Sequence, residues 1–369
     1  MKTYPLKSIS LEQAKQKQFK LIDEICKEFK GSEYLNAGDY GLVPGMNKPV
    51  YAQKVENVLA NYFSCEKALL VTGSGTGAIR WALSAIFNKD DKILIHTAPI
   101  YPTSEVSINS LGLNIIRADF NSLKDIENTI AENPDIKGAL VQYTRQAIED
   151  SYDIQEVINT IKKCNNNIKI ITDDNYAVMK VEKIGVEMGS DVSTCSCFKL
   201  QGPEGVGLLL GQKEILDKVE KMNYSGGSKV QGPQAMEVLR GLIYSPVMLA
   251  IQAEVNEELV ERLNSGSIPE IKDAFLANAQ SKVLLVEFNE PIAKAVLKNT
   301  EKLGGLPNPV GAESKYESVP MFYKVSGTFL KANPSLIDTM IRINPNRAGA
   351  DTIIRILSES IKEAKNVSK

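Results

Sequence analysis

The sequence predicts an α/β protein: a three-layer αβα large domain with a mostly parallel seven-stranded sheet, followed by a smaller α+β C-terminal domain. From Lys67 onward, short apolar runs alternate with segments of helical character, which is typical of a parallel sheet covered by helices. After about Gly232 the pattern changes to longer amphipathic helical stretches. A chain of 369 residues, 43% of them hydrophobic, can bury a core in each of two domains.

Seven apolar runs are the expected strands of the large sheet: Ala68 to Thr72, Lys92 to His96, Leu113 to Ala118, Gly138 to Gln142, Lys169 to Thr172, Val192 to Cys195 and Val206 to Leu210. Helices are expected between them at 77–87, 101–111, 122–132 and 154–164. In the smaller domain, strand signals lie at 320–325 and 340–343, and a helix at 350–364. We therefore expect an N-terminal helix and arm over residues 1–48, a large ligand-binding domain over 49–240 and a small domain over 241–369.

Composition and charge exclude several classes of partner. The 43 basic and 45 acidic residues are mixed along the chain and give a net charge of -2. The sequence therefore does not predict a basic surface that would bind nucleic acid or an anionic membrane. The first residues lack the apolar run of a signal peptide, and no later segment is expected to span a bilayer. We expect a cytoplasmic protein that binds a small molecule.

Cysteine and histidine usage narrows the chemistry further. Five scattered cysteines argue against a disulfide framework, and a single histidine argues against a zinc site. The pair Cys195 and Cys197 is expected to be buried and structural, with redox activity as the alternative.

A glycine-rich turn follows the first expected strand, between Thr72 and Ile79. Such a turn at a helix N-terminus aims backbone N–H groups at an anion. It also fits a relaxed Gly-x-Gly-x-x-Ala dinucleotide fingerprint, but the next strand ends without the acidic residue that holds a ribose hydroxyl, and no Gly-Lys-Ser/Thr follows for a Walker loop. We expect a single phosphate held by Ser74, Gly75 and Thr76; a purely structural turn is the alternative.

Two acidic residues, Asp173 and Asp174, follow the apolar run that begins at Lys169. In this fold class ligands lie at the carboxyl ends of strands. An aspartate there can pair with a protonated pyridine nitrogen, which lets pyridoxal phosphate act as an electron sink. Asp173 is the candidate for this pairing, and a helix N-cap or a metal-binding carboxylate is the alternative.

A lysine, Lys199, stands between an apolar strand and a glycine-rich return strand. Most lysines are solvated surface groups, but desolvation at such a turn favours the neutral, nucleophilic amine. A neutral amine can form a Schiff base with the cofactor and later move the α-proton of a substrate. Ser196, three residues earlier, is placed to add a hydroxyl group to the phosphate site.

An arginine, Arg342, sits in an apolar strand-like run of the smaller domain. Its planar guanidinium matches a carboxylate through two parallel hydrogen bonds, which suits an amino-acid substrate. A structural ion pair explains an isolated arginine of this kind equally well.

These features, in this order, resemble the fold type I pyridoxal-phosphate enzymes of the aspartate aminotransferase superfamily, over most of the chain from about Tyr40. The run from Asn47 to Ile79 looks like the corresponding run of the cysteine/methionine-metabolism lyases, in which a Ser-Gly-x-Gly/Ala segment holds the phosphate. The run from Lys199 to Gly205 is closer to selenocysteine synthase and its ammonia-lyase relatives. Features of aminotransferase class V are also present, so the chain straddles subfamilies.

The resemblance implies roles for individual residues. It implies that Tyr101 stacks on the cofactor ring, with an aromatic core residue as the alternative. Asp173, with Tyr176 three positions later, matches the segment that contacts the pyridine nitrogen, and the Ser-x-x-Lys spacing of Ser196 and Lys199 matches the segment of the cofactor lysine. Arg342 matches the arginine that binds the substrate α-carboxylate.

One departure from the lyase pattern concerns the phosphate. Those enzymes bring a Tyr-x-Arg segment from a neighbouring subunit, whereas no arginine follows Tyr40 in Tyr40-Gly41-Leu42. One phosphate contact is therefore missing, and Ser228 or Lys229 is a candidate replacement. The family usually forms dimers with active sites at the subunit interface, so we expect a symmetric homodimer with shared active sites.

The leading functional hypothesis is an amino-acid lyase that removes the α-proton and eliminates a β or γ substituent. An aminotransferase needs the same lysine, aspartate and arginine, and racemisation needs a partner for Lys199 such as Tyr176. Two hypotheses of other classes are a nicotinamide (NAD) oxidoreductase, built on the glycine-rich turn, and a non-catalytic binding protein that kept the fold.

Overall fold

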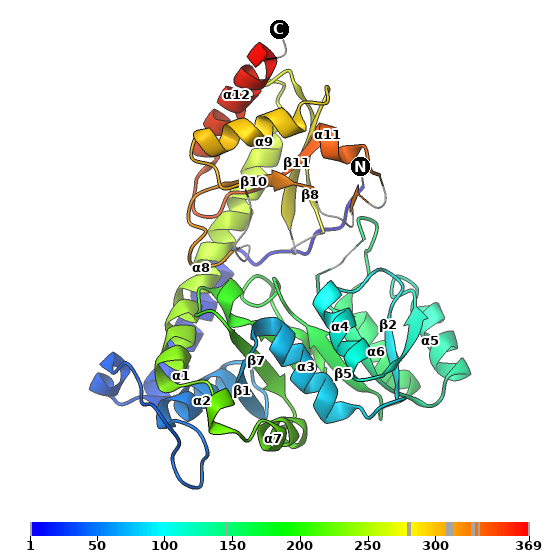
Figure 1. Cartoon of the computed structure of the whole chain (residues 1–369), viewed down its shortest axis with the longest axis vertical. Helices are drawn as coiled ribbons and strands as arrows, with labels where there is room; N and C mark the ends of the chain where they lie inside the picture. The colour runs from blue at the N-terminus through cyan, green and yellow to red at the C-terminus, as the bar shows by residue number, and fades with distance from the viewer. Residues whose placement is uncertain are drawn as a thin grey trace. The chain divides into compact units, whose positions relative to one another are not determined.

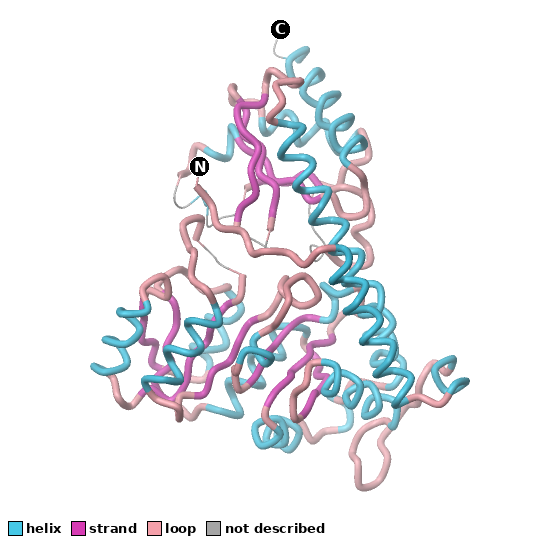
Figure 2. Tube along the Cα trace, turned by 180° about the vertical axis from the view of Figure 1, so that it is seen from behind, coloured by secondary structure: helices cyan, strands magenta, loops and turns pink. Residues whose placement is uncertain are grey.

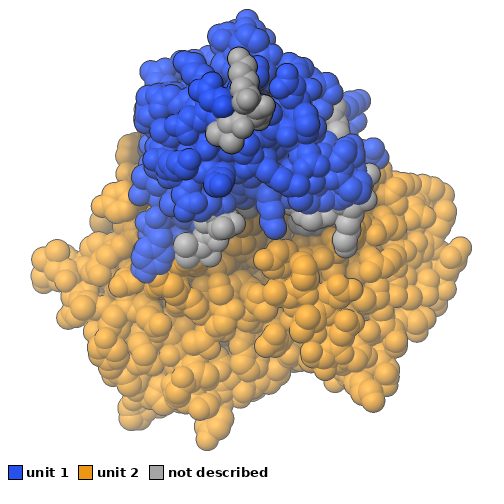
Figure 3. Space-filling model, turned by 45° about the horizontal axis from the view of Figure 1, so that its top comes forward, with its two compact units in different colours: residues 1–11, 145–150, 247–369 blue, residues 12–144, 151–246 orange. Residues whose placement is uncertain are grey.

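The computed structural model describes residues 2–144, 147–278, 282–307, 313–325, 329–330 and 333–367. The chain divides into two compact units (Figure 3). The large unit comprises residues 12–144 and 151–246, and the C-terminal unit comprises residues 1–11, 145–150 and 247–369.

The large unit is built on a seven-stranded sheet (Figure 1). Its strands are β1 (Lys67–Thr72), β2 (Lys92–His96), β3 (Asn114–Ala118), β4 (Ile136–Gln142), β5 (Lys169–Asp173), β6 (Val192–Ser196) and β7 (Val206–Gly211). The order is β1-β7-β6-β5-β4-β2-β3. Strand β7 runs antiparallel to both of its neighbours, and the other pairs are parallel. The predicted mostly parallel seven-stranded sheet is confirmed.

Helices cover both faces of this sheet (Figure 2). They are α1 (Leu11–Glu28), α2 (Val50–Tyr62), α3 (Ser74–Ile86), α4 (Pro102–Ser110), α5 (Leu123–Glu132), α6 (Ile154–Cys164) and α7 (Lys213–Met222), with 3-10 turns η1 (Gly31–Leu35), η2 (Gly185–Met188), η3 (Cys197–Leu200) and η4 (Gly226–Ser228). Because both faces are covered, the central strands β6 and β7 are buried along their whole length, and β5 is buried from its second residue on. Helix α3 contributes Ala78, Ala82 and Leu83 to one core cluster with β1, β2 and β7.

The C-terminal unit contains a four-stranded antiparallel sheet of order β10-β11-β9-β8. Its strands are β8 (Ile271–Ala277), β9 (Val283–Phe288), β10 (Met321–Lys324) and β11 (Met340–Asn344), and its helices are α9 (Ala293–Lys302), α11 (Leu336–Thr339) and α12 (Ala350–Val367). The expected strands near 320 and 340 and the expected helix from 350 are present. Strands β8 and β9 are additions that the sequence pattern did not predict.

Helix α8 (Gly232–Leu263) corrects one expectation. It contains an 18-residue window with a mean hydropathy of 1.3, so by length and composition it is apolar enough to cross a membrane. The expectation that no segment is long and apolar enough to span a bilayer is therefore wrong, by length and composition alone. The window is 56% buried inside the protein, Leu259 and Leu263 belong to the C-terminal core, and Ser245 donates to the backbone oxygen of Leu200 at 2.9 Å. These contacts are those of a core helix.

The five cysteines are all free thiols. Cys195 and Cys197 are buried, and burial raises the pKa of Cys197 to about 12 and that of Cys195 well above its usual value. A thiol that stays protonated is a poor nucleophile, which agrees with the structural role predicted for this pair.

Candidate active site

The glycine-rich turn joins β1 to α3 in a conformation that depends on glycine. Gly73 has φ +98° and Ser74 has φ +59°. A Cβ placed on Gly77 would lie 2.3 Å from the backbone oxygen of Thr72. The turn is held from outside as well, because the amides of Gly73 and Ser74 both donate to the backbone oxygen of Gly205, at 2.8 and 3.0 Å.

This turn presents backbone N–H groups at the start of a 13-residue helix. The amide of Gly77 donates to the oxygen of Gly73 at 2.8 Å, so the amides of Gly75 and Thr76 precede that bond and point out of the helix end. The partial positive charge of the helix N-terminus adds to their attraction for an anion. The geometry suits one phosphate group, as the sequence predicts.

Hydroxyl groups from neighbouring elements surround the turn. Ser196, at the end of β6, has its Oγ 2.6 Å from Oγ of Ser74. Thr76 and Thr103 share a hydrogen bond of 3.0 Å between their Oγ1 atoms. Thr103 lies in the first turn of α4, close after Tyr101. The structure thus brings Ser74 and Ser196 together, and it ties Thr76 to the segment that carries Tyr101.

Asp173 ends β5 and is 6% exposed. Its Oδ1 accepts hydrogen bonds from the backbone amide and from Nδ2 of Asn175, at 3.1 and 2.7 Å. The Oδ1 atom of Asn175 in turn accepts the backbone amide of Ser196 at 3.0 Å. These bonds join Asp173 to the end of β6. That end lies next to the glycine-rich turn from Gly73 to Gly77, which we call the phosphate turn.

Lys199 lies in η3, directly after β6. Its Nζ is 3.8 Å from the centroid of the Tyr176 ring, which is close enough for a cation–π contact. Tyr176 has φ +64°, an uncommon conformation for a residue with a side chain. A second amine, Nζ of Lys180, lies 5.6 Å from the same ring centroid.

Asp174 is fully buried beside Asp173. Burial raises the pKa of its carboxyl group to about 7, and the negative charge of Asp173 adds to the rise. Hydrogen bonds from Oγ1 of Thr172, at 3.1 Å, and from the amide of Gly185, at 3.2 Å, oppose it in part. This group faces the interior, whereas Asp173 lies at the strand end.

The residues of the large unit fit pyridoxal phosphate on structural grounds. A helix N-terminus with two outward amides and adjacent hydroxyl groups suits the phosphate, a carboxylate at the end of β5 suits the pyridine nitrogen, and a lysine amine follows β6. Gly75 supports this fit, because a Cβ there would lie 2.9 Å from Nδ2 of Asn175 and fill the turn.

The remaining predicted residues lie elsewhere. Tyr101 is 51% exposed at the N-cap of α4, and Tyr40 is 78% exposed in the segment before α2. Arg342 lies on β11 of the C-terminal unit, where Nε donates to the oxygen of Lys324 at 2.9 Å and the guanidinium lies 4.1 Å from the Tyr323 ring centroid. Among the residues that the structure describes, these are the contacts of its guanidinium, and no carboxylate pairs with it.

Ser228 and Lys229, the candidate replacements for the missing arginine, have other contacts. The hydroxyl group of Ser228 donates to Asn223 and to the oxygen of Ser225. Lys229 lines a small cavity with Glu56 and Glu220, and its burial lowers the pKa of its amine. Both residues nevertheless lie beside the end of β1, directly before the turn: Oγ1 of Thr72 donates to the backbone oxygen of Ser228 at 3.4 Å, and Lys229 forms an isolated β-bridge with Val71.

Sequence reasoning missed Asn175 and Thr103. An Asp-x-Asn pattern directly after a strand is a signal for the first, because asparagine side chains bond to backbone groups in turns. A signal for Thr103 is absent from the sequence, because its bond to Thr76 depends on the packing of α3 against α4.

The sequence model of the aminotransferase class-V family matches residues 46–238, and that of the YhfS-like C-terminal domain matches residues 257–357. The chain belongs to the aminotransferase class-V family and is a fold type I, pyridoxal-phosphate-dependent protein. This assignment favours pyridoxal phosphate over the nicotinamide cofactor considered above.

Among individual proteins, the chain is 53% identical to protein YhfS of Escherichia coli strain K12 over 362 residues, 98% of this chain and 99% of that one. The crystal structure of the pyridoxal-5'-phosphate-dependent protein YhfS from Escherichia coli superimposes with a TM-score of 0.96, at 52% identity over 98% of this chain and 99% of that chain.

More distant relatives share less sequence. Cysteine desulfurase IscS of Clostridium botulinum is 22% identical over 236 residues, 60% of this chain and 56% of that one. The carbon-sulfur lyase involved in aluminum resistance from Clostridium novyi has a TM-score of 0.73 at 15% identity, over 95% of this chain and 91% of that one. The last likeness shows the fold alone.

Proposed function

We propose that this protein is a lyase that acts on an amino acid by α-proton abstraction and elimination of a β or γ substituent. The observation that carries the proposal is the meeting of three elements in the large unit. The phosphate turn contacts Ser196 through Ser74, Ser196 contacts Asp173 through Asn175, and Lys199 follows Ser196 by three residues.

In this proposal, Ser74, Gly75, Thr76 and Ser196 hold the phosphate. When bound, the cofactor supplies an electron sink for negative charge that develops at the substrate α-carbon. The carboxylate of Asp173 holds the proton of the pyridine nitrogen in place by its opposite charge, and the ring of Tyr101 stacks on the cofactor.

Lys199 has two tasks in the proposed reaction. Its Nζ would hold the cofactor covalently, and as a free amine it would remove the α-proton of the substrate as a general base. The ring of Tyr176, 3.8 Å from Nζ, limits where that amine can move. Arg342 binds the substrate carboxylate through its guanidinium.

An aminotransferase is the second candidate, and the match to the aminotransferase class-V family favours it. The same lysine, aspartate and arginine serve both reactions, which differ in the carbon to which the proton returns. The resemblance of residues 47–79 to the cysteine/methionine-metabolism lyases favours elimination.

Two experiments test the proposal. Borohydride reduction of the holoenzyme should leave a pyridoxyl adduct on Lys199, and Lys199→Ala should abolish both adduct and turnover, whereas the exposed-site control Lys213→Ala should retain them. Amino acids should then be screened for keto-acid release. Ammonia released without an added acceptor supports the lyase, and dependence on an added keto acid supports the aminotransferase.

We also propose that the protein acts in the cytoplasm as a homodimer in which Tyr40 reaches the active site of the partner subunit. Its 78% exposure agrees with such a role. Light scattering gives the oligomeric state. Mixing inactive Lys199→Ala with inactive Tyr40→Ala subunits should restore part of the activity, because a mixed dimer then contains one intact site; no recovery would contradict shared sites.

A further inference from the structure

Asn175 lies where three parts of the cofactor site meet. Its Nδ2 and its backbone amide both donate to Oδ1 of Asp173, at 2.7 and 3.1 Å, and its Oδ1 accepts the backbone amide of Ser196 at 3.0 Å. The bridge spans neighbouring strands, because Asp173 on β5 pairs in register with Thr194 on β6. One side chain thus fixes the ends of both strands relative to each other.

The same amide packs against the phosphate turn. A Cβ placed on Gly75 would lie 2.9 Å from Nδ2 and 3.2 Å from Oδ1 of Asn175, and 3.3 Å from Cβ of Ser196. A side chain at position 75 would have to displace this amide, which its hydrogen bonds to Asp173 and Ser196 hold in place. The turn, Asn175 and Ser196 therefore form one closely packed group, to which the bond between Ser74 and Ser196 belongs as well.

The chemistry of the bridge requires an amide. An amide side chain has donors at one end and an acceptor at the other, so it serves the carboxylate of Asp173 and the N–H of Ser196 at the same time. A carboxylate at position 175 would repel Asp173, and alanine would leave the amide of Ser196 without its acceptor.

We propose that Asn175 is a positioning residue for the cofactor: it holds the carboxylate of Asp173 toward the pyridine nitrogen and Ser196 toward the phosphate. It acts through these two residues. The proposal rests on the pyridoxal-phosphate cofactor and on the proposed role of Asp173, and it holds for a lyase and an aminotransferase alike.

The chain offers a matched control. Asn121 makes the same two bonds to Oδ1 of Asp119, at 3.0 Å from the backbone amide and 2.8 Å from Nδ2. Its Oδ1 also accepts backbone amides, from Ser151 and Tyr152, at 2.7 and 3.1 Å. Asn121 is exposed, its own turn follows β3, and the two residues that it holds lie shortly before α6.

The test measures the dissociation constant of pyridoxal phosphate and the pH titration of the visible absorption band of the holoenzyme. Asn175→Ala should weaken cofactor binding roughly 10- to 100-fold, since hydrogen bonds to a charged group contribute about 1.5–3 kcal/mol, and should move the midpoint of the titration. Asn121→Ala should leave both values within about twofold.

A third variant separates positioning from general loss of structure. Asn175→Asp keeps the size of the side chain and the acceptor for Ser196, but replaces the donor to Asp173 by a negative charge. It should therefore move the titration midpoint even where its unfolding temperature matches that of the parent. Parental affinity and titration in both Asn175 variants, or an equal loss in Asn121→Ala, would overturn the proposal.

Discussion

The large unit contains the same polar turn twice. The β5 turn is Asp173-Asp174-Asn175 and the β3 turn is Asp119-Phe120-Asn121. In each, the asparagine donates its backbone amide and its Nδ2 to Oδ1 of the aspartate, and both sets of distances lie between 2.7 and 3.1 Å. Local hydrogen bonding therefore does not distinguish the turn that we propose for the cofactor from the other turn.

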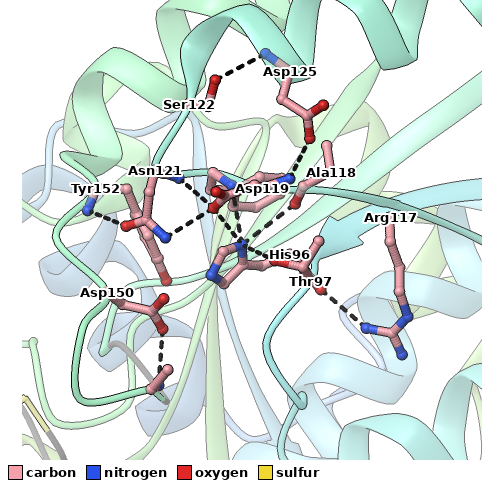
Figure 4. Close-up of polar contacts among 12 residues, drawn as sticks. His96, Thr97, Arg117, Ala118, Asp119, Asn121, Ser122, Asp125, Asp150 and Tyr152 are labelled. Atoms are coloured by element: carbon pink, nitrogen blue, oxygen red, sulfur yellow. Dashed lines mark hydrogen bonds and ion pairs between the residues drawn. The ribbon is translucent and has the colours of Figure 1, made fainter.

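The two turns differ in what the rest of the fold brings to them. In the β3 turn, Phe120 donates its amide to Nδ1 of His96 at 3.0 Å. The amide of Asp119 donates to Asp125 at 2.7 Å (Figure 4). The side chain of Asp119 is 46% exposed. The β5 turn instead faces the phosphate turn and the end of β6. In the proposed function these neighbours distinguish the β5 turn from the β3 turn, and substitutions in and beside both turns test that proposal.

The largest effect on stability is expected at the middle residue of the β3 turn. Phe120 is 1% exposed, and its ring stacks 5.2 Å from that of His96. Phe120→Ala should lower the free energy of unfolding by about 3–5 kcal/mol through lost burial and a cavity. Chemical denaturation measures this change. The folded variant should keep the parental cofactor affinity, and a weakened affinity would contradict the division between the two turns.

Substitution of the first residue of each turn, Asp173 or Asp119, should have the most different effects on kcat/KM. Asp173→Asn removes the negative charge proposed for the pyridine nitrogen and should lower kcat/KM by about 100-fold or more, the usual scale for loss of one electrostatic contact at a reacting centre. Asp119→Asn should leave kcat/KM near the parental value. Steady-state kinetics on the amino acid found in the screen compare the two, and equal losses would assign Asp173 to structure.

Asp174 in the β5 turn takes the place that Phe120 has in the β3 turn. Its pKa is about 7 in the folded protein, against 3.8 ordinarily, so between about pH 4 and pH 7 the folded state holds a proton that the unfolded chain releases. Stability should therefore fall as the pH rises through this window, by on the order of 1.4 kcal/mol for each pH unit, and become level above it.

Asp174→Asn replaces the titrating carboxyl group by an amide. The stability of this variant should therefore change less with pH than that of the parent. Unfolding temperatures of the holoenzyme between pH 5 and pH 8 provide the measurement. A variant with the parental slope would show that another group causes it.

The smallest effects are expected at two serines. Ser122 caps α5, where its Oγ accepts the amide of Asp125 at 3.2 Å, so Ser122→Ala should cost about 1 kcal/mol of stability without changing cofactor affinity. Ser74→Ala removes the bond to Ser196 and should weaken cofactor binding by roughly fivefold. Cofactor titration and thermal unfolding of both variants separate these outcomes, and reversed effects would contradict them.

Much of the fold was predictable because its strands are short apolar runs separated by turns and helices. All seven strands of the large sheet were predicted near their observed positions, as were β10, β11 and α12. Strands β8 and β9 were missed. The run of β9, Val283–Phe288, is apolar, but a short apolar run without alternation does not separate a strand from a helix.

The site was partly predictable for a related reason. Ser74, Asp173 and Lys199 follow expected strands within four residues, on the side where this fold class places ligands. The bridge from Asn175 to Ser196 was not predictable, because it requires that β5 and β6 be neighbours with Asp173 in register with Thr194. Strand order is a property of the whole sheet, and the sequences of β5 and β6 alone do not determine it.

The antiparallel strand β7 has a consequence for the order in which the site forms during synthesis. The amides of Gly73 and Ser74 donate to the oxygen of Gly205, which immediately precedes β7. The phosphate turn is therefore synthesised long before the segment that accepts its hydrogen bonds. A nascent chain that has exposed β1 and α3 but still holds β7 inside the ribosome lacks this anchor. The turn therefore has its full set of hydrogen bonds only once the segment before β7 has joined the sheet.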